Sequence, residues 1–157
     1  MLRAMASTAG DKGVVASLNT TSHGPLLAYL ADSQGLEVVL AQETHVVPSR
    51  LGSIQGQAQD AGFKCMWAPA IPTAGAGSQG WVAVLVPSHG QVTGPPRRTS
   101  PISEDCRVVA ALVHWGPGGF VAVSCYLRDG EGVQGANLAT LWEIVKYLHE
   151  LNDCGYD

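Results

Sequence analysis

The sequence predicts an α/β fold with mixed β-sheet layers flanked by helices. Apolar runs of strand length alternate with two helical patterns in the first half of the chain, and further strand-like runs and a last helical pattern follow. This order, β-α-β-α, then strands, then a helix, is typical of layered α/β or α+β domains. With 157 residues, 46% of them apolar, the chain can form one core, as one domain or as part of a larger one.

The first half of the chain contains three predicted strands, at residues 13–18, 36–41 and 63–67. A helix is expected between Pro25 and Gly35 and another over residues 48–61, because apolar residues recur there at helical spacing and glycines follow. Residues 1–12 lack the hydrophobic core of a signal peptide. We therefore expect a disordered leader over residues 1–12 and a domain over residues 13–157.

The second half contains three predicted strands and one predicted helix. The clearest strand is the apolar run over residues 81–86, and strands at 107–115 and 120–127 are joined by four residues whose turn chemistry predicts a hairpin. Leucine and valine at helical spacing predict an amphipathic helix over residues 137–151. Residues 69–80 and 94–105 are rich in glycine, proline and polar residues and are expected to be connections.

Charge and cysteine content narrow the functional classes. The net charge is −4 and no basic run is longer than Arg97-Arg98, which argues against tight, non-specific binding to polynucleotides. A metal-dependent phosphodiesterase stays open, because a bound cation supplies positive charge locally. The four cysteines form no C-x-x-C pair, so we expect reduced, mostly buried thiols and an intracellular location. No stretch reaches the length of a membrane span, and no membrane partner is expected.

Glu43 is the strongest candidate for chemistry. It directly follows an apolar run that ends in Leu40-Ala41-Gln42, so it stands at the carboxyl end of a predicted strand. Open α/β sheets bind ligands at that end of their strands, and Mg²⁺ binds oxygen ligands with few protein carboxylates. The alternative is an ordinary solvated acid at a strand end.

The chain resembles the endonuclease/exonuclease/phosphatase superfamily of Mg²⁺-dependent phosphodiesterases, most closely its retrotransposon-type endonuclease branch. The resemblance covers about residues 13–151. It rests on motifs that occur in the family's order: Ser17-Leu18-Asn19, Gln42-Glu43-Thr44-His45, a glycine before the strand at 81–86, Arg107-Val108-Val109, and a strand that ends in Tyr126-Leu127, with a long helix after it.

The resemblance implies the N-terminal half of a four-layer α/β sandwich and a role for each matching residue. Asn19 and Tyr126 are implied to be catalytic, Glu43 to bind Mg²⁺ (or Mn²⁺), and His45 and Arg107 to bind substrate, with nucleic acid as the partner. From the residues alone, Asn19 is equally well a turn residue, Tyr126 a half-buried aromatic residue, and Arg107 a structural ion-pair residue.

The departures from the family pattern limit the prediction. Family members continue with a Gly-Asp-x-Asn strand end and an Asp-His pair that carry the rest of the catalytic machinery, and this chain contains neither. We therefore expect an endonuclease-like phosphodiester hydrolase domain that is truncated and catalytically incomplete alone, with the missing half or a second copy as a partner. The alternatives are an inactive half-domain that acts as a binding or interaction module, and an unrelated α/β domain. The substrate stays open among DNA, RNA, phosphoinositides and sphingolipids.

Overall fold

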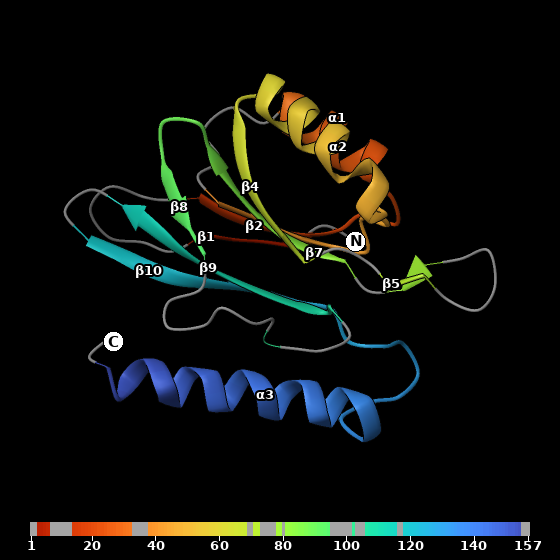
Figure 1. Ribbon diagram of the computed structural model, residues 1–157, viewed down its shortest axis with the longest axis vertical. Helices are drawn as coiled ribbons and strands as arrows, with labels where there is room; N and C mark the ends of the chain where they lie inside the picture. The colour runs from red at the N-terminus through yellow and green to blue at the C-terminus, as the bar shows by residue number, and fades with distance from the viewer. Residues whose placement is uncertain are drawn as a thin grey trace.

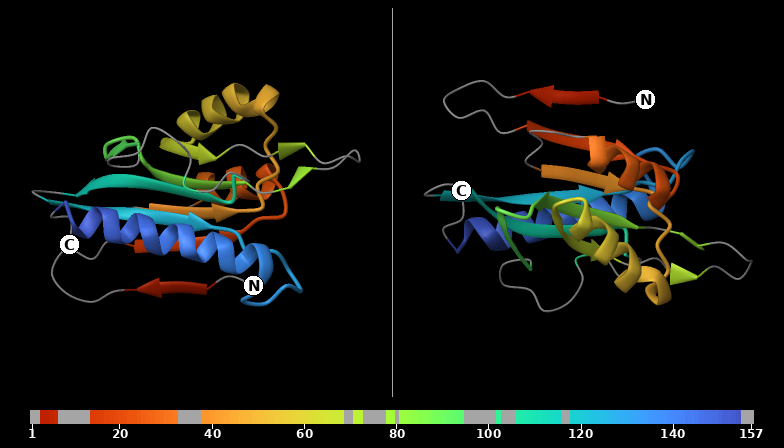
Figure 2. Two further views of the ribbon diagram at one scale, coloured as in Figure 1. Left: turned by 60° about the horizontal axis from the view of Figure 1, so that its bottom comes forward. Right: turned by 90° about the horizontal axis from the view of Figure 1, so that it is seen from above.

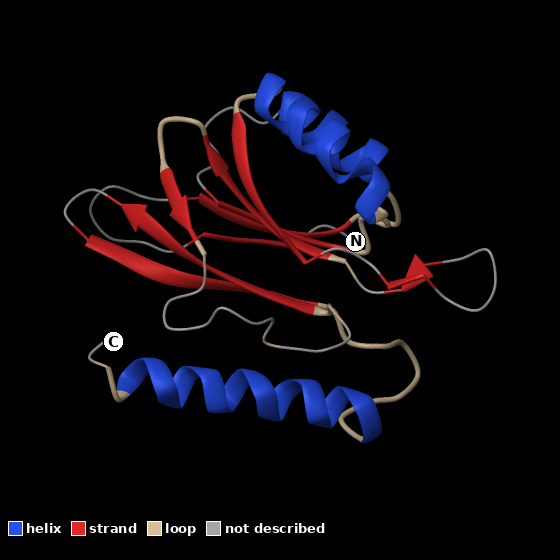
Figure 3. Cartoon of the chain, in the orientation of Figure 1, coloured by secondary structure: helices blue, strands red, loops and turns tan. Residues whose placement is uncertain are grey.

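Two β-sheets pack face to face between two helical layers (Figure 1, Figure 3). The computed structural model describes residues 3–6, 14–32, 38–68, 71–72, 78–79, 81–94, 102, 106–115 and 118–154. Helices α1 (His23–Asp32) and α2 (Pro48–Asp60) cover the outer face of one sheet, and α3 (Gly135–Asn152) covers the outer face of the other. The predicted α/β fold with mixed sheet layers and flanking helices is confirmed.

The first sheet has five strands in the order β1-β2-β3-β7-β4. Strands β2 and β3 run parallel, with α1 as the crossover between them, and β7 is antiparallel to both of its neighbours, β3 and β4. The strand bounds are β1 (Arg3–Ala6), β2 (Val14–Asn19), β3 (Val38–Gln42), β4 (Phe63–Ala68) and β7 (Val82–Pro87).

Strand β1 lies within residues 1–12, for which the sequence predicts a disordered leader. Arg3–Ala6 pair antiparallel with β2 at the edge of the sheet. Backbone hydrogen bonds of this kind need no hydrophobic pattern that the sequence would reveal. The rest of the expected leader lies outside the described residues.

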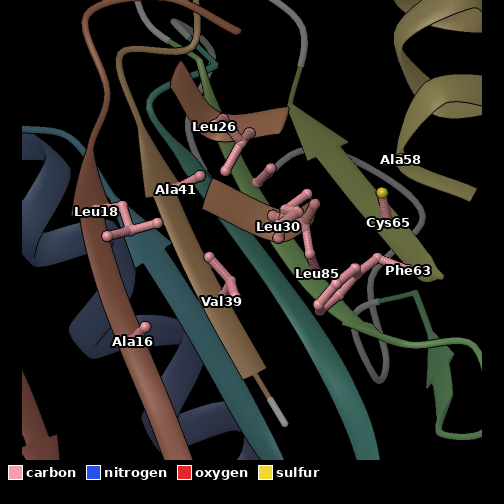
Figure 4. Close-up of a cluster of buried hydrophobic side chains, with 11 residues drawn as sticks. Ala16, Leu18, Leu26, Leu30, Val39, Ala41, Ala58, Phe63, Cys65 and Leu85 are labelled. Atoms are coloured by element: carbon pink, nitrogen blue, oxygen red, sulfur yellow. The ribbon is translucent and has the colours of Figure 1, made fainter. Parts of the chain in front are cut away.

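The core on the helix side explains the positions of α1 and α2 (Figure 4). Leu26 and Leu30 of α1 are one helical turn apart and pack on Val39 and Leu85 in one buried cluster. Helix α1 begins at His23, two residues before the expected Pro25, and α2 begins with Pro48 at its first turn, as proline's fixed φ favours. Gly62, with a φ of 87°, follows the end of α2.

A second core lies between the two sheets. Val82, Val84 and Val86 of β7 face the second sheet, whereas Ala83 and Leu85 face the helices. All five of these residues are almost completely buried. Burial on both faces is the reason why this strand appears in the sequence as a continuous apolar run.

The second sheet has three strands in the order β10-β9-β8, with β8 at Gln91–Thr93, β9 at Val108–Trp115 and β10 at Gly118–Cys125. Strands β9 and β10 form the predicted antiparallel hairpin, in register from Cys125↔Val108 to Gly118↔Trp115. Strand β8 was not predicted, and neither was the small sheet of β5 (Ile71–Pro72) and β6 (Ser78–Gln79), because strands of two or three residues are too short to show an alternating pattern.

Helix α3 packs on the second sheet through Tyr147 and Leu151, which contact Val108 and Ala110 of β9. The helix extends the predicted 137–151 span at both ends. Within the described part of the chain, no helix combines the length and the apolar character needed to cross a membrane.

Candidate functional site

Strands β2 and β3 end side by side at one edge of the first sheet. Their parallel register pairs Asn19 with Gln42, so Glu43 follows directly at the same edge. Thr20 closes this edge, because its backbone N–H and its Oγ1 both donate to the Gln42 carbonyl, at 3.0 and 3.1 Å. Since Ala16 and Leu18 face the helices, the exposed Asn19 side chain lies on the face turned toward the second sheet. Asn19 and Glu43 therefore lie at the same edge of the first sheet.

Strand β10 of the second sheet is tied to β3 close to this edge. The buried Ser124 hydroxyl donates to the Ala41 carbonyl at 3.1 Å and accepts a hydrogen bond from Gln42 Nε2 at 3.3 Å. The same Gln42 nitrogen also lies 3.3 Å from Ser17 Oγ and 3.1 Å from the Leu40 carbonyl oxygen. These contacts connect β2, β3 and β10, and they fix where the chain leaves β10.

Tyr126 follows β10 and meets Glu43. The phenol donates a hydrogen bond to the Glu43 side chain, and this bond is the largest cause that raises the pKa of Tyr126 to about 12. Partial burial and the negative charges of Glu43 and Asp129 act in the same direction, whereas the positive charge of Arg107 opposes them. Tyr126 is therefore a neutral hydrogen-bond donor at physiological pH, aimed at the predicted metal ligand.

Arg107 lies beneath Tyr126 and is only 3% exposed. Its carbonyl accepts the Tyr126 backbone N–H at 2.9 Å, and its guanidinium donates to Asn137 Oδ1 at 3.1 Å and to the Ala136 carbonyl at 3.3 Å. A buried guanidinium requires such acceptors. Because Arg107 is buried and bonded in this way, it holds the Tyr126 backbone in position. Its positive charge also lies near the Tyr126 phenol.

Asn137 organises the loop after Tyr126, and the sequence argument missed it. Its Oδ1 accepts the Arg128 backbone N–H at 2.7 Å, and its Nδ2 donates to the carbonyls of Arg128 and Gly132 at 2.9 Å each. Asn137 is almost completely buried. An asparagine in the first turn of a helix, after a loop rich in turn residues, was the available signal, because such asparagines often bond nearby backbone groups.

Backbone strain concentrates at the same edge. Within the described residues, five non-glycine residues have positive φ: Thr21, Glu43, His45, Trp81 and Cys106. Thr21 follows the end of β2, and Glu43 and His45 follow the end of β3. Trp81 precedes the start of β7, and Cys106 precedes the start of β9. Because β7 is antiparallel to β3 and β9 is antiparallel to β10, all five lie at one edge of the sandwich. Such conformations cost about 1–3 kcal/mol each and cluster at functional sites.

His45 lies at the rim of this edge next to Glu43, against the ring of the buried Trp81. The exposed His45 ring lies 6.3 Å from the Trp81 ring, centroid to centroid, at an interplanar angle of 39°. Trp81 is fully buried, and among the described residues neither its Nε1 nor the buried Thr44 Oγ1 has a hydrogen-bond partner. Unsatisfied buried polar atoms are rare, and here two of them flank His45.

The residues at this edge suit a cation held by few protein ligands. Glu43 supplies one half-buried carboxylate, and Asn19 supplies an amide oxygen on the adjacent strand end. Across the described ranges, no group of three or more histidine, cysteine, aspartate or glutamate residues gathers as a metal site would. A cage made entirely of protein ligands is therefore not formed by these residues, whereas Mg²⁺ typically keeps several waters and takes one or two carboxylates.

Comparison with known proteins identifies the fold. No protein-family model and no curated protein matches the sequence. Among solved structures, the chain is similar to the endonuclease domain of TRAS1, a telomere-specific non-LTR retrotransposon, with a TM-score of 0.54 and 14% sequence identity. The similarity covers 84% of this chain and 52% of that domain, so the chain spans about half of its length. The chain therefore has an endonuclease-like fold.

Proposed function

We propose that this chain is a Mg²⁺-dependent, endonuclease-like phosphodiester hydrolase domain that binds nucleic acid and is catalytically incomplete alone. The observation that carries the proposal is the hydrogen bond from Tyr126 to Glu43, at the edge where Asn19 also lies. The bond joins two residues that are far apart in the sequence, one after β3 of the first sheet and one after β10 of the second. The endonuclease-like fold supports the proposal.

In this proposal Glu43 holds the cation, Mg²⁺ or Mn²⁺. The bound cation supplies the positive charge that a phosphodiester requires when negative charge builds on its oxygens. Tyr126 orients the Glu43 carboxylate through its hydroxyl, and its raised pKa keeps that hydroxyl protonated as a donor to Glu43 or to a phosphate oxygen. Asn19 offers an uncharged amide to the same position.

His45 and Arg107 contribute to substrate binding in different ways. His45 is exposed at the rim, where its imidazole can contact a phosphate or base directly. Arg107 is buried, so it acts by positioning Tyr126 and by adding positive charge near the phenol. With a net charge of −4, the chain depends on the cation and on these two side chains for its attraction to nucleic acid.

A second candidate is a binding module that lacks hydrolysis. The observation that favours it is the position of His45, the histidine nearest to Glu43 in the sequence, whose ring lies against the Trp81 ring. Hydrolysis needs a base within hydrogen-bond reach of the attacking water. We therefore propose that the chain binds the cation but does not complete catalysis alone.

Metal binding tests the proposal without requiring turnover. Mn²⁺ is titrated into the protein and the bound fraction is measured by electron paramagnetic resonance. We expect saturable binding by the wild type, loss of at least roughly tenfold in affinity for Glu43→Gln, and wild-type affinity for Asp60→Asn, which neutralises an exposed acid on α2. Equal binding by all three proteins would contradict the metal site.

Cleavage of supercoiled plasmid DNA in Mg²⁺ tests whether the chain is catalytically incomplete alone, as both candidates require. We expect no nicking by the purified chain above the background of the Glu43→Gln protein. Nicking that depends on Mg²⁺ and on Glu43 would show instead that the chain is a complete enzyme.

A further inference from the structure

Asn137, in the first turn of α3, directs all of its side-chain hydrogen bonds to groups outside its own helix. Its Oδ1 accepts from Arg107 Nη1 and from the Arg128 backbone N–H, and its Nδ2 donates to the carbonyls of Arg128 and Gly132. Two accepted and two donated bonds are the full capacity of a side-chain amide. Asn137 is 1% exposed, and a buried polar group that makes all of its bonds fixes the arrangement of its partners.

These bonds hold the backbone around Tyr126. The Tyr126 N–H donates to the Arg107 carbonyl, and the guanidinium of the same Arg107 is bonded to Asn137. Residues 126–134 belong to no helix or strand, and in this segment Arg128 is bonded to Asn137 through both its N–H and its carbonyl. Asn137 therefore bonds the residue that faces Tyr126 across the hairpin and also the residue two positions after it.

The first turn of α3 gives Arg107 a second acceptor near the same strand ends. The Ala136 carbonyl accepts from Arg107 Nη2 at 3.3 Å and from the buried Thr140 hydroxyl at 2.9 Å. The loop between β10 and α3 lies at the same end of the molecule as the ends of β2 and β3 (Figure 2). The start of α3 is thus bonded to the part of the chain that carries Tyr126, next to Glu43.

The loop between Tyr126 and Asn137 has a backbone suited to these bonds. Gly130 and Gly132 have φ values of 78° and 60°, in the region that favours glycine, and they turn the chain back toward α3. An asparagine that served only to begin the helix would accept hydrogen bonds from the N–H groups of the first turn. The bonds of Asn137 go instead to Arg107 and to the loop, which indicates a role beyond starting the helix.

We propose that Asn137 is a positioning residue of the Glu43 site, through which the first turn of α3 and the binding of the cation are coupled. The inference rests on the proposed function, in which Tyr126 orients the metal-binding carboxylate of Glu43. A site must hold its groups to within roughly 0.5 Å, and the phenol hydroxyl lies at the far end of a long side chain whose backbone Asn137 fixes. Coupling is reciprocal, so a cation bound at Glu43 should in turn hold the Arg128 amide more firmly on Asn137.

The first test is a double-mutant cycle on cation affinity. Mn²⁺ binding to the full chain is measured by electron paramagnetic resonance for the wild type, Asn137→Ala, Tyr126→Phe and the double variant. We expect each single variant to bind about tenfold more weakly than the wild type. The double variant should bind no more weakly than Tyr126→Phe, because Asn137 acts on the cation through that phenol.

A variant at the other end of α3 controls for lost stability. Leu151 is buried and lies about 20 Å from Asn137 along the helix. Leu151→Ala should therefore lower the stability of the fold through lost burial but keep wild-type affinity for Mn²⁺.

The second test needs no variant of Asn137. Hydrogen exchange at the Arg128 amide, which donates to Asn137 Oδ1, is followed in the wild type with and without saturating Mg²⁺. We expect the bound cation to slow this exchange by roughly fivefold or more. In Glu43→Gln and in Tyr126→Phe, Mg²⁺ should leave the exchange unchanged, because the connection between the cation and Asn137 is removed.

The contrary outcomes separate this inference from the proposed function. Wild-type affinity in Asn137→Ala, additive losses in the double variant, or an equal loss in Leu151→Ala would refute the positioning role. Arg128 exchange that Mg²⁺ leaves unchanged in the wild type would refute the coupling, even if Asn137→Ala failed to fold. In all of these cases Glu43→Gln would still lose Mn²⁺ binding and the proposed function would stand. Binding that survives in Glu43→Gln would instead refute the metal site, and this inference with it.

Discussion

The two sheets of this sandwich differ in how completely their surroundings cover them. In the first sheet, β7 is central and its residues Val82 to Val86 are at most 1% exposed, enclosed by helices on one face and by the second sheet on the other. In the second sheet, β10 is an edge strand, and Val121, Val123 and Cys125 toward α3 are only half-buried. Among the described residues, the central strand of the first sheet is therefore enclosed more completely than β10 of the second sheet.

The candidate site lies where these two sheets meet, which indicates how its precision arises. Asn19 and Glu43 stand on the enclosed sheet, and Tyr126 comes from the open one. The hydrogen bonds from Gln42 to Ser124 and from Ser124 to the Ala41 carbonyl connect the two sheets next to the site. Side chains next to regular strands are positioned more precisely than side chains on loops. The end of β3 therefore fixes the position of Glu43, and the end of β10 fixes the position of Tyr126.

Truncating one leucine in each region gives the largest expected contrast. Leu85 of β7 is fully buried, so Leu85→Ala should lower the free energy of unfolding by about 3 kcal/mol through lost burial and a residual cavity. Leu148 is 48% exposed, so Leu148→Ala should lower it by less than about 1 kcal/mol. Urea denaturation followed by circular dichroism measures both. Comparable losses would mean that the flank of α3 is already covered.

The second-largest loss of stability is expected from removing Asn137, the buried asparagine that bonds Arg107 and the loop after Tyr126. Asn137→Ala removes an acceptor of the Arg107 guanidinium and three backbone contacts of the loop, and should lower the free energy of unfolding by about 2–3 kcal/mol. Hydrogen exchange at the Arg128 amide should also accelerate. Asn152→Ala, at the exposed end of the same helix, is the matched control and should change neither quantity. A loop that stays protected in Asn137→Ala would refute this role.

The link between the sheets is expected to contribute less. Ser124→Ala removes one hydroxyl that both donates to Ala41 and accepts from Gln42, and the expected loss of stability is about 1 kcal/mol. Ser53→Ala removes an exposed hydroxyl that accepts a hydrogen bond from Gln57 one helical turn away, and should lower the stability little. Thermal unfolding of the two variants compares them directly, and equal midpoints would show that the inter-sheet bonds do not stabilise the sandwich.

Sequence reasoning succeeded where a residue pattern reflects burial on one or two faces. The apolar run of β7, the leucines of α1 and the glycine-rich turn of the β9–β10 hairpin each have a direct physical signature, and their elements were predicted to within a few residues. The proximity of Asn19 and Glu43 has a simple structural cause, because β2 and β3 are parallel neighbours that end side by side. Strands β1 and β8 were not predicted, because they pair with their neighbours through backbone groups, and backbone pairing leaves no pattern in the sequence of side chains.

The contacts of the site that join the two sheets could not be predicted from the sequence. Ser124 and Gln42 lie 82 positions apart, and no local pattern indicates that they meet. The positive φ of Glu43 was equally hidden, because glutamate has no preference for that region and only the surrounding structure enforces it. The burial of Arg107 depends on Asn137, whose position is fixed by the docking of α3.

Titration of Tyr126 gives the smallest effect and examines the meeting point of the two sheets directly. The pKa of Tyr126 is raised to about 12 from an ordinary value of 10.0, with the Glu43 hydrogen bond as the first cause. Because the folded state favours the protonated phenol, the associated stabilisation is present below pH 10 and is lost as the pH rises toward 12. In Glu43→Gln the pKa should fall back toward 10, and in Asp129→Asn it should fall only slightly, since that residue acts through charge alone. Tyrosinate absorbance, taken as the difference between each protein and its Tyr126→Phe counterpart, isolates this phenol from the other three tyrosines. A titration curve that Glu43→Gln leaves in place would mean that the strand ends of the two sheets do not meet through Tyr126.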